Sequence, residues 1–189
     1  LRNSKKLLGM INNILEFSKI ESGKYEVASS SFLLSNFLSE IYNSTEPLFS
    51  EKNLDFNIVT KEKVDYLVKT DKLKLEHILL NLIGNAVKFT EKGIVTIKVS
   101  SQNSRDISFE VIDTGIGISP KAQGDLFERF VQKDSSTTRK YGGSGLGLAI
   151  SQGLVRLMKG EIGLISDGET GSTFWFYVEC GIGKHNADI

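Results

Sequence analysis

Three stretches of this chain alternate apolar and polar residues, a spacing typical of strands with one covered face. They lie at residues 54–58, 95–99 and 107–111. From 75 to 87 the apolar residues instead recur every three or four positions, as on one face of a helix. Because strands and helices are interspersed, we expect an α+β fold, a two-layer α/β sandwich in which helices cover one face of a mixed sheet.

The same spacings predict the remaining elements. Helices are expected at 7–17, 32–49 and 145–158, and strands at 162–165 and 172–180. Gly23 should end the first helix and Gly160 the last, while Ser31 or Ser35 caps the second. The first helix cannot bury its own apolar stripe, so it packs on the domain or on another chain. Residues 181–189 resemble a tail or linker.

Composition excludes several classes of protein. Lys+Arg and Asp+Glu are 23 each in 189 residues, so no basic excess indicates nucleic-acid binding. One cysteine, Cys180, and two histidines argue against disulfide frameworks, Cys-rich zinc sites and His-based metal centres. No apolar run approaches the ~20 residues of a membrane-spanning helix, and no signal peptide opens the chain. We therefore expect a cytoplasmic fragment, and Leu1 in place of Met indicates a piece of a longer protein.

A polar stripe accompanies the helical segment 71–90. Asn81, Asn85 and Lys88 fall at i, i+4 and i+7, beside the apolar stripe. Two amides and an ammonium offer oxygen ligands for a hard cation and positive charge for phosphate. The neutral carbonyl oxygen of Asn85 suits Mg²⁺ that already carries phosphate oxygens. A solvated polar face is the alternative interpretation.

A carboxylate followed by glycines closes the strand at 107–111. In Asp113-Thr114-Gly115-Ile116-Gly117 the acid can point into a cavity while the backbone turns close by. Such a carboxylate could accept a hydrogen bond from an exocyclic amine such as adenine N6. A strand-ending Asx turn with ordinary loop glycines explains the same residues.

A glycine-rich loop opens the predicted helix at 145–158. Gly143, Gly145 and Gly147 let backbone amides approach an anion, and the helix N-terminus favours negative charge. The preceding residues 134–141 form a polar loop and not a strand, which excludes a dinucleotide-binding unit. The pattern indicates a phosphate cradle behind a mobile polar lid.

Just before this loop, Phe127 and Phe130 can anchor the segment 126–132 by burial and leave Arg129 free for phosphate or a partner. A short core-packing helix accounts equally well for the two aromatic residues.

In this order the segments resemble the ATP-binding catalytic domain of sensor histidine kinases, part of the ATPase superfamily shared with gyrase, Hsp90 and MutL. The N, G1, F and G2 boxes of that family correspond to residues 81–90, 113–117, 127–130 and 143–148. Gly171-Ser172-Thr173-Phe174 matches a terminal strand whose Thr helps to hold adenine. The resemblance covers about residues 25–180 and implies ATP and Mg²⁺ as cofactors.

The resemblance also implies roles for single residues. Asp113 would bind the adenine amine, Asn85 would coordinate Mg²⁺, and Asn81 and Lys88 would support the phosphates during catalysis. The other nucleotide-binding residues would be Gly115, Gly117, Phe130, Gly143, Gly145, Leu146, Gly147, Leu148 and Thr173.

Domains and partners follow from the same resemblance. Residues 1–24 resemble the end of the second helix of a dimerisation bundle, 25–180 the ATP-binding domain, and 181–189 a tail. The phosphoacceptor histidine of the family lies on the first bundle helix, which this sequence lacks. The implied partners are that histidine, a response-regulator receiver domain and a second copy in the full-length protein. Whether the full-length protein is anchored to a membrane is a question that the sequence leaves open.

Departures from the family pattern refine the expected activity. His77 stands where the family has Gln, His185 lies in the tail, and Lys74 replaces an Arg. Hydrolytic members of the superfamily carry a general-base Glu where this chain has Asn81, and an amide cannot take that proton. We expect a phosphotransfer module that hydrolyses ATP slowly and does not phosphorylate itself. A non-catalytic regulatory module of the same fold is the alternative, and Asn81 disfavours a chaperone- or DNA-linked ATPase.

Overall fold

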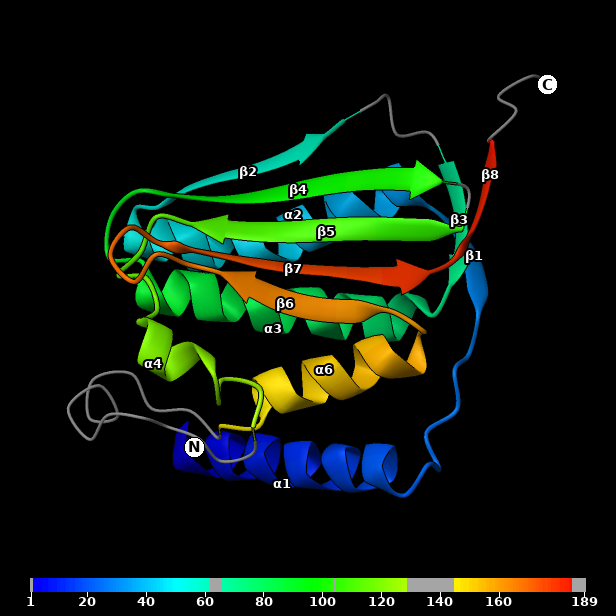
Figure 1. Ribbon diagram of the computed structural model, residues 1–189, viewed down its shortest axis with the longest axis horizontal. Helices are drawn as coiled ribbons and strands as arrows, with labels where there is room; N and C mark the ends of the chain where they lie inside the picture. Colours follow the sequence, from blue (N-terminus) through cyan, green and yellow to red (C-terminus); the bar gives the residue numbers. More distant parts are fainter. Residues whose placement is uncertain (1, 62–65, 104, 129–144, 185–189) are drawn as a thin grey trace.

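The computed structural model describes residues 2–61, 66–103, 105–128 and 145–184. Figure 1 shows how its helices and strands are arranged in space. In chain order they are α1 (Arg2–Glu21), β1 (Ser30–Leu33), α2 (Leu34–Lys52), β2 (Asp55–Thr60), β3 (Tyr66–Thr70), α3 (Lys72–Phe89), β4 (Ile94–Asn103), β5 (Asp106–Asp113), α4 (Pro120–Gln123), α6 (Gly147–Leu157), β6 (Glu161–Ile165), β7 (Ser172–Glu179) and β8 (Gly181–Lys184).

A five-stranded sheet forms one layer of the fold. Its strand order is β2-β4-β5-β7-β6. The β2 and β4 strands are parallel, and the other neighbours are antiparallel. The helices α2, α3 and α6 lie against one face of this sheet, and α1 lies against α6 (Figure 1). The predicted two-layer α/β sandwich with a mixed sheet is confirmed.

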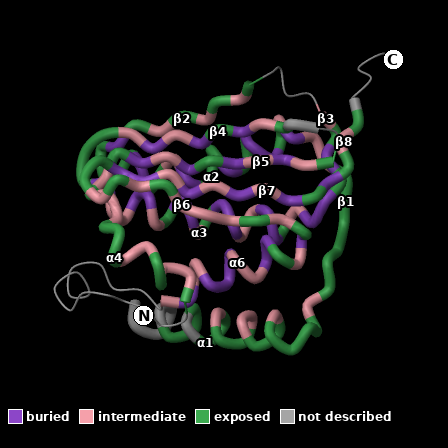
Figure 2. The backbone as a smooth tube through the Cα atoms, in the orientation of Figure 1, coloured by how far each residue is buried: buried purple, intermediate pink, exposed green. Residues whose placement is uncertain are grey.

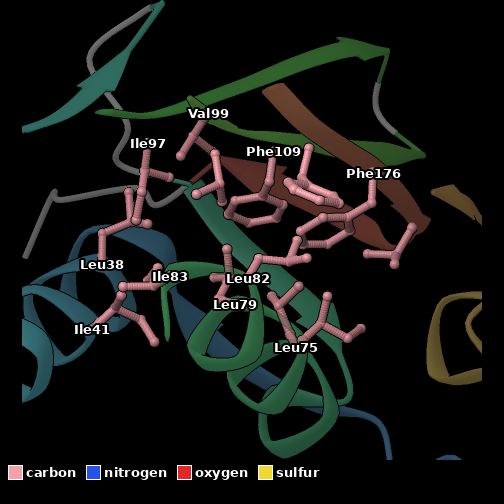
Figure 3. Packing of buried hydrophobic residues seen from close by; sticks show 14 of the residues in the cluster. Leu38, Ile41, Leu75, Leu79, Leu82, Ile83, Ile97, Val99, Phe109 and Phe176 are labelled. Carbon is pink, nitrogen blue, oxygen red and sulfur yellow. The ribbon is translucent and has the colours of Figure 1, made fainter. Parts of the chain in front are cut away.

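The core lies between that sheet and α3. In β5 and β7 every second side chain points toward the helices. Phe109 and Phe176 are paired on this face, and their rings stack with centroids 5.0 Å apart. From α3, Leu75, Leu79 and Leu82 point toward these rings, and none of the three is exposed (Figure 3). Each such buried side chain stabilises the fold by roughly 1.5–3 kcal/mol. The two-residue spacing of the strands and the three- to four-residue spacing of the helix therefore identify these elements from the sequence.

The first helix, α1, docks with one face and exposes the other. Phe17 and Ile20 pack against the core, but large apolar side chains closer to the N-terminus stay exposed (Figure 2). These are Leu7, Leu8, Ile11, Ile14 and Leu15, which are 45–60% exposed. Within the described residues, no helix combines the length and the hydropathy needed to cross a membrane.

Gly23 ends α1 as expected. It adopts φ +64°, and the N–H groups of Gly23 and Lys24 donate to the carbonyls of Ile20 and Lys19. This is the Schellman arrangement, in which the left-handed position favours glycine.

A second sheet was not expected from the sequence. Its order is β1-β3-β8 and both pairings are antiparallel. Residues 181–184, expected to belong to a loose tail, form β8 and pair with β3. These strands are four or five residues long, and their partners lie far away in the sequence, so no local period marks them.

Two helix ends differ from the predictions. Neither Ser31 nor Ser35 caps α2, because residues 30–33 form β1 and Leu33 occupies the cap without a side-chain hydrogen bond. At the end of α6 the left-handed residue is Lys159, with φ 56°, and not Gly160. Gly160 is required for another reason, since a Cβ there would lie 1.7 Å from the carbonyl oxygen of Tyr177.

Candidate functional site

The candidate site residues gather along α3, where β5 and α6 meet it. The end of β5, α4 and the C-terminal end of α3 lie at the same end of the molecule (Figure 1). Two close contacts define the region. Asn81 lies against Gly147 at the start of α6, and the carbonyl of Phe89 lies against Gly115 beyond β5.

The helix α3 positions the predicted polar stripe. Its N-terminus is capped by Asp71, whose side chain accepts from the backbone N–H of Lys74 at 3.1 Å. Its apolar stripe is buried, which leaves Asn81, Asn85 and Lys88 half-buried on the adjoining surface. Burial lowers the pKa of Lys88 from its ordinary value. The Lys88 ammonium lies 4.7 Å from the centre of the Phe89 ring.

The side-chain amide of Asn81 joins α3 to α6. Its Nδ2 donates to the Oγ of Ser151 at 2.8 Å. A Cβ on Gly147 would lie only 2.3 Å from Oδ1 of Asn81, so any side chain at position 147 would displace the amide. The glycine therefore serves close packing between the two helices. Sequence reasoning missed Ser151, although it stands one helical turn after Gly147.

Asp113 ends β5 and is buried. Its Oδ1 accepts from the backbone N–H of Gly115 at 2.9 Å, and the backbone N–H of Ser172 also donates to this carboxyl. Burial raises the pKa of Asp113, and these two N–H groups oppose that rise. The local Asx-type hydrogen bond to Gly115 is present, and it holds a buried acceptor in one orientation.

The glycines after Asp113 are required by close approach. A Cβ on Gly115 would lie 2.5 Å from the carbonyl oxygen of Phe89 and 2.8 Å from Asp113 Oδ1. Gly117 has φ +69°, and a Cβ there would lie 2.8 Å from the backbone nitrogen of Glu169. The segment thus crosses the end of α3 with no room for side chains at either glycine.

Thr173, to which the resemblance gives a part in holding adenine, does not lie directly opposite Asp113 in the sheet. In the β5–β7 register Asp113 pairs with Ser172, and Thr173 pairs with Ile112. Successive strand residues point to opposite faces, so Thr173 faces away from the carboxylate. Ser172, which is buried, is the residue of β7 that lies opposite Asp113.

The start of α6 carries the next group of predicted residues. Gly145 has φ +69°, Leu146 is buried, and Leu148 is half-buried and packs against the core. The two leucines thus anchor the glycine-rich turn to the domain. Phe130, Gly143, Arg129 and the polar loop 134–141 lie outside the described residues. Phe127 is half-buried and packs against the core as expected.

Comparisons with known proteins agree on one family. Residues 70–182 match the family model described as histidine kinase-, DNA gyrase B- and HSP90-like ATPase. The signal transduction histidine-protein kinase BarA of Escherichia coli strain K12 is 41% identical over 181 residues, which cover 94% of this chain and 20% of BarA. The autoinducer 2 sensor kinase/phosphatase LuxQ of Vibrio vulnificus strain CMCP6 is 41% identical over 177 residues, covering 91% of this chain and 21% of LuxQ.

A solved structure shares this fold over nearly the full length of the chain. Full-length ShkA, crystallised with AMPPNP, superposes with a TM-score of 0.86 and 31% identity over 97% of this chain and 38% of ShkA. The chain thus spans about a fifth of the length of the two sensor kinases above. With its mixed sheet, its buried aspartate at the end of β5 and the polar stripe of α3, the chain belongs to the histidine kinase-, DNA gyrase B- and HSP90-like ATPase family.

Proposed function

We propose that this chain is the ATP-binding catalytic module of a sensor histidine kinase. It binds Mg-ATP and presents the γ-phosphate to a histidine on a helical bundle. The observation that carries the proposal is the buried carboxylate of Asp113, which two backbone N–H groups hold in place at the end of β5. The nucleotide analogue named in the ShkA structure supports the same ligand class.

Asp113 fits the exocyclic amine of adenine. A carboxylate accepts hydrogen bonds only, and N6 of adenine is a donor. Gly115 leaves the space beside Asp113 Oδ1 free of a side chain. Ser172, and not Thr173, supports this carboxylate from β7. We therefore assign adenine recognition to Asp113 with the backbone of Gly115 and Ser172 around it.

The α3 stripe fits the metal and the phosphates. Asn85 would hold Mg²⁺ through its amide oxygen, a hard neutral ligand of the kind this ion takes when phosphate oxygens supply the others. Once bound, Mg²⁺ would neutralise charge on the phosphates. Lys88, one turn further along α3, adds a positive charge at the end of the stripe. The glycine-rich turn at 145–147 would offer its backbone N–H groups to the phosphates.

Phosphate transfer is favoured over hydrolysis because position 81 holds an asparagine, which cannot act as a general base for water. The Asn81 amide donates to Ser151 and cannot take a proton from water. Positioning and charge neutralisation then supply most of the catalysis, as is usual in phosphoryl transfer. We expect slow ATP hydrolysis by this chain.

The phosphoacceptor is proposed to come from outside this chain. His77 is paired with Glu16 on α1, and His185 lies outside the described residues. Residues 1–24 would be the end of the bundle helix and 25–180 the catalytic domain, to whose second sheet residues 181–184 add the strand β8. The exposed apolar face of α1 suits pairing with a second copy in the full-length protein. A response-regulator receiver domain would take the phosphoryl group next, in the cytoplasm, where ATP is supplied.

Calorimetric titration of Mg²⁺ and a non-hydrolysable ATP analogue into the chain tests the proposal. We expect saturable, Mg²⁺-dependent binding that Asp113→Ala weakens by about 10- to 100-fold, the cost of losing a hydrogen bond to a charged group. Glu110→Ala is the matched control, since Glu110 is an exposed acid on the same strand. A folded chain that binds no nucleotide would contradict the proposal and favour the regulatory module.

A further inference from the structure

Ser151 is a buried hydroxyl in the second turn of α6 that the proposed function does not use. It is 1% exposed. Burying a hydroxyl costs free energy unless it is hydrogen bonded, and serine is a poor residue for a helix interior. The Ser151 Oγ accepts a hydrogen bond from Nδ2 of Asn81 on α3, at 2.8 Å. A serine at this place is therefore explained by what it does for Asn81.

Ser151 and Gly147 act on the Asn81 amide together. They stand four residues apart on α6 and so face the same side of the helix. A Cβ on Gly147 would lie 2.3 Å from Asn81 Oδ1, 3.1 Å from Cγ and 3.2 Å from Nδ2, so the whole amide group lies on this glycine. The Ser151 hydroxyl accepts from the Nδ2 end of the amide, and the Oδ1 end lies nearest to Gly147. Asn81 is thus held from both ends.

We infer that Ser151 is a positioning residue for nucleotide binding. It holds the carboxamide of Asn81 in one orientation at the start of α6, so that Asn81 meets the phosphate and metal end of Mg-ATP already ordered. This inference rests on the proposed function, because it concerns the same site. Without the Ser151 hydroxyl the Asn81 side chain regains its free rotation, and binding must order it again.

The test measures affinity and its coupling to Asn81. We expect Ser151→Ala to weaken binding of the Mg²⁺-bound ATP analogue by about five- to tenfold, the effect of one neutral hydrogen bond. Because Ser151 acts through Asn81, Ser151→Ala should have no further effect in the Asn81→Ala background. Ser151→Cys, close in size but a weak acceptor, keeps the comparison valid if the alanine variant folds poorly. An equal loss of affinity in both backgrounds would overturn the inference.

Thr45→Val is the matched control. Thr45 is also a 1% exposed hydroxyl in a helix, and its Oγ1 donates to the Ile41 carbonyl at 2.7 Å. Its removal should lower the melting temperature and leave the affinity for nucleotide unchanged. If Thr45→Val weakens binding as much as Ser151→Ala does, the effect is one of general stability and the inference is wrong.

A spectroscopic readout separates this inference from the proposed function. The side-chain amide resonance of Asn81, identified by its loss in Asn81→Ala, should shift in Ser151→Ala without any nucleotide present. A wild-type chain that binds no nucleotide overturns both the proposed function and the positioning role. A wild-type chain that binds nucleotide, with affinity unchanged in Ser151→Ala, overturns the positioning role alone.

Discussion

Glu16 on α1 and His77 on α3 form an ion pair, with the carboxylate Oε1 3.1 Å from the imidazole Nδ1. The same oxygen accepts from the Tyr25 hydroxyl at 2.9 Å. This cluster, together with Lys74 4.6 Å from the centre of the Tyr25 ring, joins the first helix to the N-terminal end of α3. The first helix is therefore held by hydrogen bonds as well as by apolar contact, and by charge where His77 is protonated.

The Glu16–His77 pair predicts a pH-dependent contribution to stability. The hydrogen bond to Glu16 raises the pKa of His77 above its ordinary 6.5, against a lowering by partial burial. Burial alone would raise the pKa of Glu16, but hydrogen bonds from His77 and Tyr25 bring it below 4.5. Because folding raises the pKa of His77, its contribution to stability is complete at pH values below the pKa of the unfolded state and is lost as the pH rises through the folded pKa. Because folding lowers the pKa of Glu16, its contribution is complete above the pKa of the unfolded state and is lost as the pH falls through the folded pKa.

The pair should therefore stabilise the fold most between about pH 4.5 and 6.5. Melting curves of the wild type and of His77→Gln, taken from pH 4 to pH 9, measure this. The difference in melting temperature should be largest in that window and should shrink above about pH 8. Because the His77 side chain is 40% exposed, the effect should be small and weaker in high salt. A difference that is constant across pH would contradict the prediction.

Gly153→Leu should detach α1 from the domain. A Cβ on Gly153 would lie 2.7 Å from Cγ2 of Ile20, so α1 can pack on α6 only because this residue has no side chain. We expect faster hydrogen exchange and faster proteolysis of residues 2–21 in the variant. Gly84→Leu is the control, because nothing lies within 4 Å of a Cβ at that position of α3. Unchanged protection of α1 in Gly153→Leu would show that the contact can relax.

Gly115→Ala should impair nucleotide binding and stability together. The new Cβ would lie 2.5 Å from the Phe89 carbonyl oxygen and 2.8 Å from Asp113 Oδ1, and backbone cannot move as a flexible side chain can. We expect a loss of about 1–3 kcal/mol in the free energy of unfolding, the usual cost of overpacking. Calorimetry should also show weaker binding of the ATP analogue. Gly124→Ala, at an exposed glycine with open space, should change neither quantity.

Lys52→Met should weaken the end of α3. The Lys52 ammonium donates to the carbonyl of Val87 at 2.6 Å, where the last helical carbonyls lack backbone partners. Losing this charged cap should cost about 0.5–1 kcal/mol of unfolding free energy in urea titrations. Lys72→Met removes a partly exposed ion pair with Glu40 instead and should cost less than about 0.5 kcal/mol. Equal losses in the two variants would argue against the capping role.

Local periodicity was sufficient for the main layer of the fold. The two-residue spacing of β4 and β5 and the helical spacing of α3 each mark one buried face, and burial of that face is the largest stabilising contribution. Asp113 at the end of β5 and the glycines beyond it were also found from sequence, because a residue type and a turn are local properties. The roles that the resemblance implied for these residues remain proposals.

Other features depend on contacts that no local pattern records. The sheet β1-β3-β8 forms from short strands whose partners are distant in sequence. The left-handed end of α6 falls on Lys159 because Gly160 is needed against Tyr177.

The site itself shows the same division. The sequence places Ser172 and Thr173 side by side, but strand register decides that Ser172 accompanies Asp113. Nothing in the local sequence distinguishes Ser151 from the other serines, and only the packing of α3 on α6 brings it to Asn81. The sequence specifies which face of each helix or strand is buried, because the hydrophobicity of each residue and its spacing along the chain are local properties. Which side chains then meet depends on register and on helix packing, and only the folded chain sets these.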